Sequence, residues 1–261
     1  MPAKIVEHFI VILLHLSAAA FYAAAMLRGQ TAAQNTKPAA TKPSADIIFL
    51  AAAMLLHALG LAINYQSYPR WDIGVGASLF ALFAAAPCRA LTRPGIIRIS
   101  LLLFVALASL APLAAQTNNP PPGGLSLAHA LLAMASYALA LATMLLWLEL
   151  HLSEKIQRIT GQAAPPLLQQ EAACFRWLAV SFALLTLTLL SGLIASDGYA
   201  LTHKNLFAAL TWLVFAVLLL GRYLRGWRGR RAKAGFAAGF VFLLLSYFGS
   251  AFVLQIILQR S

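Results

Sequence analysis

Four of the six histidines lie in apolar segments where an imidazole could do chemistry. His15 and His57 fall half-way along the first two segments, and His129 and His203 lie at the starts of the fifth and seventh. Ionisable side chains inside a membrane are costly to bury and are candidates for a functional site. Two neutral imidazoles on opposite faces of a haem make a six-coordinate b-type centre. The histidines therefore predict two candidate layers for haem b.

The outer candidate layer combines His129, one turn into the fifth segment, with His203, the first residue of the seventh. A haem at a membrane face keeps its propionates near water, where a cation such as Lys204 or Arg70 can pair with them. We therefore interpret His129 and His203 as candidate iron ligands and Lys204 as a propionate partner. The alternative is that His203 and Lys204 are ordinary interfacial polar residues.

The inner candidate layer combines His15 and His57, each ~14–15 Å from the outer boundary at 1.5 Å of rise per residue. They share this depth on consecutive antiparallel helices, so they could face each other. A histidine in a membrane helix can also hydrogen-bond a neighbouring helix without binding a ligand. Both interpretations of this pair stay open at the level of sequence.

The helices that position these residues must form from a chain that is 61% hydrophobic and only 10% charged. Soluble domains are nearer half apolar and a quarter charged, and the apolar residues here come in blocks of about 20, the length that crosses a bilayer. We expect an all-α polytopic membrane protein whose residues 1–261 form one integral domain. Its eight expected spans are 5–27, 46–66, 72–90, 95–115, 125–150, 172–195, 203–222 and 233–257.

The placement of the positive charges predicts orientation. The formal net charge is +12, and fifteen of the 19 Lys and Arg residues lie in or beside the loops after the first, third, fifth and seventh segments. Such loops face the cytoplasm, so both termini are expected outside, which is the periplasm in a bacterium. This predicts a multi-pass protein of the inner (cytoplasmic) membrane, in contact with lipid, and argues against nucleic acid as a partner.

Motifs of soluble enzymes are missing from the sequence. It has no GxSxG, P-loop, HExxH or dinucleotide fingerprint. None of the seven acidic residues is central in a span, whereas proton-coupled transporters often carry buried carboxylates. We therefore expect no enzymatic activity, and we rank a transporter below the other hypotheses.

Three stretches together resemble a known family. They are "HALLAMASYALALATMLLWLELHL" (129–152), "HKNLFAALTWLVFAVLLLGRYLRGWRGRRA" (203–232) and "GFVFLLLSYFGSAFVLQIIL" (239–258). They are similar to the cytochrome c assembly superfamily, and most of all to its HemX-like and YpjD-like inner-membrane branch. The resemblance implies a haem-handling protein of cytochrome biogenesis, with other biogenesis membrane proteins as possible partners.

The family pattern carries over in part. The resemblance matches His129 to an external histidine that opens the corresponding helix, and His57 to a histidine in an early span. The tryptophan-rich external segment with which that family presents haem is absent, and "SDGYALTHKN" (196–205) stands in its place. Two further family histidines fall near Leu220 and Leu258, and neither is histidine. His203 and His15 as replacement ligands are our inference from the residues.

The alternative hypothesis is a regulatory or scaffolding membrane protein without a cofactor, acting on haem synthesis or cytochrome maturation. The basic loop "GRYLRGWRGRRAK" (221–233) and the loop 151–171 would then be its cytoplasmic contact surfaces. Binding of anionic lipid is the simpler role for the basic loop.

Overall fold

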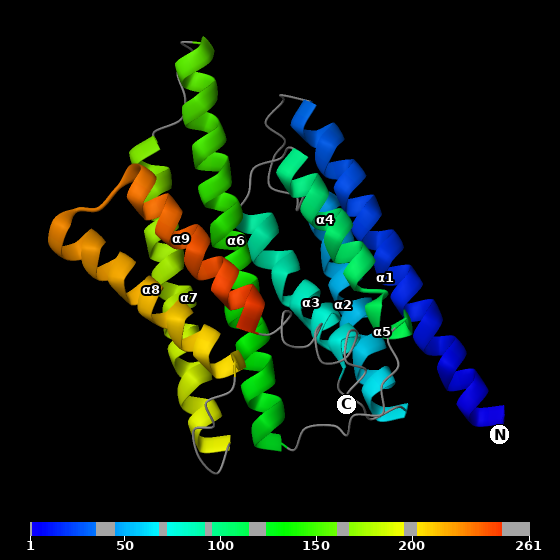
Figure 1. Cartoon of the computed structure of the whole chain (residues 1–261). Coiled ribbons are helices and arrows are strands. Elements are labelled where there is room, and N and C mark those ends of the chain that lie inside the picture. Colours follow the sequence, from blue (N-terminus) through cyan, green and yellow to red (C-terminus); the bar gives the residue numbers. More distant parts are fainter. Residues whose placement is uncertain are drawn as a thin grey trace. The chain divides into compact units, whose positions relative to one another are not determined.

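The computed structural model describes residues 2–34, 45–67, 72–91, 96–114, 124–160, 167–195 and 203–246. Within these ranges the chain is helical apart from short turns, which confirms the predicted all-α class. The helices are α1 (Pro2–Gln34), α2 (Ala45–Ser67), α3 (Ile73–Leu91), α4 (Ile96–Ala108), α5 (Ala111–Ala114), α6 (Gly124–Thr160), α7 (Leu167–Ala195), α8 (His203–Arg225) and α9 (Gly229–Leu244) (Figure 1).

Each of the eight apolar segments contains a helix, and α4 and α5 share the fourth. Five stretches, in α1, α2, α6, α7 and α8, are long and apolar enough to cross a membrane, and two shorter apolar helices cover Ile73–Pro87 and Ser100–Leu113. The protein is therefore a polytopic membrane protein. The total of eight spans and the outward placement of both termini stay predictions, since the last expected span runs beyond the described residues.

Two element boundaries differ from the expected ones. The segment 151–160 continues α6 as one helix, so the first half of the expected loop 151–171 is helical. It has no Gly or Pro, and it contains the helix formers Glu154 and Lys155. The fourth segment is broken at Ser109, whose hydroxyl donates to the Ala106 carbonyl at 2.7 Å. Pro112 then removes the backbone donor that would continue α4.

The described helices form two compact units, α1–α5 in unit 1 and α6–α9 in unit 2. The single integral domain stays a prediction. In unit 1, α1 packs along α2 and against α4, and α3 contacts α2, α4 and α5. Small residues let these helices approach closely, and the buried core includes Ala18, Ala53, Ala81 and Ala85 around the ring of Tyr22.

Asp72 directly precedes α3 and caps its N-terminus. Its carboxylate accepts the backbone N–H of Val75 at 2.8 Å, which satisfies one of the donors that a helix N-terminus leaves without an intrahelical partner. Asp72 is fully buried. The cap therefore fixes where α3 begins, and with it the register of the residues that α3 presents to α2.

Unit 2 has an aromatic core. Trp147 of α6 lies between Phe175 of α7 and Phe236 of α9, with ring centroids 5.5 and 6.3 Å away, and Phe236 stacks on Phe215 of α8 at 5.4 Å. A methyl group on Gly239 would lie 2.4 Å from the Phe215 ring. At this point of the stretch "GFAAG" (235–239), only glycine lets α9 approach α8 so closely.

Candidate functional site

His129 of α6 lies against the end of α7. Its side chain is half-buried, and its Nδ1 is 3.0 Å from the Ser191 hydroxyl. The next residue, Gly192, makes room for the ring, because a methyl group there would lie 3.0 Å from the imidazole Cε1. Ser191 and Gly192 thus form the part of α7 against which the imidazole of His129 packs.

Ser191 connects His129 to the backbone of α7. Its hydroxyl donates to the Thr188 carbonyl at 2.9 Å, and the same oxygen lies 3.0 Å from His129 Nδ1. Metal-ligating histidines commonly have one ring nitrogen held by a protein oxygen in this way, which fixes the orientation of the ring.

The other predicted outer residues, His203 and Lys204, are the first two residues of α8. Only their backbone belongs to the described structure. α7 packs against both α6 and α8, and successive helices run in opposite directions, so the starts of α6 and α8 and the end of α7 share one end of unit 2 (Figure 1). The structure thus brings His129 to Ser191 and Gly192 and puts the start of α8 at the same end.

The inner histidines lie together in unit 1, as their shared depth predicted. His15 of α1 and His57 of α2 are both fully buried, and their ring centroids are 5.9 Å apart. Both nitrogens of His57 take part in hydrogen bonds, Nδ1 with the Tyr22 hydroxyl at 3.2 Å and Nε2 with the Ser78 hydroxyl at 2.7 Å. His57 therefore links α1, α2 and α3.

A haem between these two rings does not fit the described packing. His57 would have to give up one of its two hydrogen bonds to ligate iron. His15 has no hydrogen-bond partner on either ring nitrogen within the described residues, but a methyl group on Gly60 would lie only 3.3 Å from its Nε2 and from the Leu14 Cβ. α1 and α2 would thus have to separate to admit a porphyrin, and the arrangement is that of a buried polar cluster.

Several partners of the histidines were not predicted from sequence. Tyr22 and Ser78 hold His57, and Ser191 holds His129. Hydroxyls in apolar helices usually bond their own backbone, as Ser191 also does, so their position in the sequence does not show that a histidine shares them. No group of three His, Cys, Asp or Glu side chains in the described ranges could hold a metal ion.

Comparison with known proteins agrees with the resemblance of the three stretches. The family model "Cytochrome C assembly protein" matches residues 11–258. The chain is 32% identical to "Inner membrane protein YpjD" of Escherichia coli K12 over 232 residues, 81% of this chain and 87% of that protein. It is also 34% identical over 86 residues to "Cytochrome c biogenesis protein CcsA" of Prochlorococcus marinus MIT 9303, 31% of this chain and 27% of that protein.

The long match to YpjD and the apolar helices place the chain in the inner membrane as a multi-pass protein. The family match covers nearly all of both units and includes all four candidate histidines. The chain belongs to the cytochrome c assembly protein family.

Proposed function

We propose that the chain binds haem at one end of unit 2 and supports cytochrome c biogenesis without catalysing bond chemistry. His129 and His203 would hold the haem iron. Lys204, the neighbour of His203, pairs with a propionate. With the proposed orientation, this end of unit 2 faces the periplasm.

The observation that carries the proposal is the hydrogen-bond chain from His129 Nδ1 to Ser191 and on to the Thr188 carbonyl. It orients the ring before any ligand arrives, as the protein partners of metal-ligating histidines do. Haem would supply an iron that histidine nitrogens can ligate, together with two carboxylates. The family membership adds a reason to expect haem rather than another metal group.

The two units then have separate roles in this proposal. Unit 2 carries the ligands, and unit 1 has the buried polar cluster of His15, His57, Tyr22 and Ser78. The second ligand comes from the first residue of α8, next to a segment that lacks the tryptophan-rich sequence of haem-presenting relatives. We therefore propose binding or sensing of haem rather than its attachment to an apocytochrome.

The test is the absorption spectrum of the purified chain, oxidised and then reduced, after expression with added haem. The wild type is expected to show the sharp reduced bands of a six-coordinate b-type haem. His129→Ala and His203→Ala should each abolish that spectrum or convert it to a five-coordinate one. Ser191→Ala should keep the ligand but weaken haem binding by about tenfold or more, as losses of such orienting partners do.

A matched control is His151→Ala, which removes an exposed histidine from the opposite part of the same helix. It should leave the spectrum unchanged. A well-folded wild type without haem bands would refute the proposal and favour the regulatory alternative. A normal spectrum in both His129→Ala and His203→Ala would refute the ligand assignment.

A further inference from the structure

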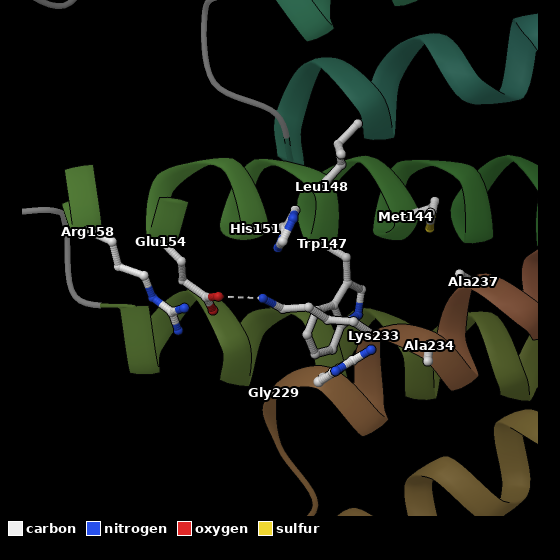
Figure 2. Close-up of a pocket in the computed structure, with 11 residues that line it drawn as sticks. Met144, Trp147, Leu148, His151, Glu154, Arg158, Gly229, Lys233, Ala234 and Ala237 are labelled. Atoms are coloured by element: carbon white, nitrogen blue, oxygen red, sulfur yellow. Dashed lines mark hydrogen bonds and ion pairs between the residues drawn. The ribbon is translucent and has the colours of Figure 1, made fainter. Parts of the chain in front are cut away.

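A second candidate site lies between α6 and α9, far along α6 from His129. The α6–α9 pocket has a volume of about 620 Å³, and its lining side chains come from both helices (Figure 2). It does not share a residue with the proposed haem ligands. Six of its lining residues define it here: Met144, Trp147, Arg158, Arg230, Lys233 and Ala237.

The pocket is apolar at one end and cationic at the other. Met144 and Ala237 line the apolar end. Arg158 and Lys233 line the other end, and Lys233 is paired there with the carboxylate Glu154 (Figure 2). Arg230, the residue after Gly229 in α9, also lines the pocket. Three cations thus face one carboxylate. Arg158 and Arg230 are exposed, so their guanidinium groups can meet a ligand without losing much hydration first.

The start of α9 borders the pocket and already has an anionic partner. Gly229, the first residue of α9, lines the pocket, and its backbone N–H donates to the buried carboxylate of Glu171 at 3.1 Å. The excess positive charge of the pocket therefore comes from its arginine side chains and not from the helix dipole.

The position along α6 places the pocket at a membrane boundary. The hydrocarbon core is about 30 Å thick, which about 20 helical residues cross. Counted from His129 at one face, the opposite face falls near Glu149. Met144 then lies at the level of acyl chains, and Arg158 lies about 13 Å beyond Glu149, at the level of headgroups. The change from apolar to cationic lining coincides with this boundary.

We propose that the α6–α9 pocket binds the phosphate headgroup of an anionic phospholipid, with an acyl chain along Met144 and Ala237. A phosphate diester provides the oxygens that two guanidinium groups can share, and its single negative charge offsets the excess of cations. A free phosphate ion would share this chemistry but would leave the apolar end of the pocket uncovered. The proposal does not depend on haem binding by unit 2.

The test compares binding of phosphatidylglycerol and phosphatidylcholine with identical acyl chains to the delipidated full chain, counted by native mass spectrometry. The double variant R158Q/R230Q should weaken phosphatidylglycerol binding by about tenfold or more, with phosphatidylcholine unchanged. The control R225Q/R228Q removes the same charge from exposed arginines that do not line the pocket. It should stay within about twofold of wild type.

A second variant keeps all charges and alters only the apolar end. Ala237→Leu fills that end, so it should also weaken phosphatidylglycerol binding, and it decides the question if R158Q/R230Q fails to fold. If R158Q/R230Q and R225Q/R228Q weaken phosphatidylglycerol binding equally, the proposal is overturned in favour of diffuse electrostatic attraction. Displacement of the lipid by an equal concentration of inorganic phosphate would overturn it in favour of a free anion site.

Discussion

His57 of unit 1 and His129 of unit 2 are chemically alike, but their surroundings differ. His57 is fully buried and uses both ring nitrogens to join three helices. His129 is half-buried, and its Nδ1 lies 3.0 Å from the Ser191 hydroxyl at the end of α7. The first arrangement joins the helices of a buried core, and the second orients a partly exposed ring at one end of unit 2. Burial and the number of helices joined therefore distinguish the two histidines better than the residue type does.

The largest expected difference between the two units is in stability. His57→Ala should lower the free energy of unfolding by about 2–4 kcal/mol, because it leaves a cavity and removes a partner from both Tyr22 and Ser78. His129→Ala should cost about 1 kcal/mol, since it removes one hydrogen bond at a half-buried position. Unfolding in mixed micelles measures both. Equal losses would contradict the distinction between a structural and a ligand histidine.

Substitution of the glycines beside His15 and His129 tests the same comparison, with expected effects of intermediate size. Gly60→Ala adds a methyl group 3.3 Å from the buried ring of His15 and from the Leu14 Cβ. We expect it to lower stability by about 1–3 kcal/mol through overpacking. Gly124→Ala is the control, because nothing lies within 4 Å of the added methyl group. A Gly60→Ala protein as stable as its control would show that α1 and α2 can separate here, and would reopen the inner pair as a haem site.

Gly192→Ala places the same methyl group 3.0 Å from Cε1 of His129. This half-buried ring can swing outward, and alanine is the better helix former, so stability should stay within about 0.5 kcal/mol of wild type. The swing would lengthen the bond to Ser191, and haem binding should weaken by about tenfold. Haem titration beside thermal unfolding measures the two effects. A loss of stability with normal haem binding would contradict the proposed role of Ser191 and Gly192 in orienting His129.

The sequence was sufficient to predict the helical class, the positions of the helices and the juxtaposition of His15 and His57. Length and composition determine the helical class and the positions of the helices. Equal depth on antiparallel neighbouring helices determines the juxtaposition of the two histidines. The rotation of each helix could not be predicted, because packing sets it. For that reason neither Ser78 nor Ser191 was identified as a histidine partner. The haem-ligand role of His129, His203, His57 and His15, and the role of Lys204, stay predictions.

The smallest expected effect isolates one hydrogen bond of the buried cluster. Tyr22→Phe removes only the hydroxyl that meets His57 Nδ1 at 3.2 Å, so the ring stays packed in the core of unit 1. We expect a loss of about 1 kcal/mol in the free energy of unfolding and an unchanged haem spectrum. Tyr65→Phe, at a half-buried position on α2, is the matched control and should change stability by less than about 0.5 kcal/mol. A shift of the haem spectrum in Tyr22→Phe would mean that His57 ligates iron after all, because the hydroxyl that this variant removes is a hydrogen-bond partner of His57.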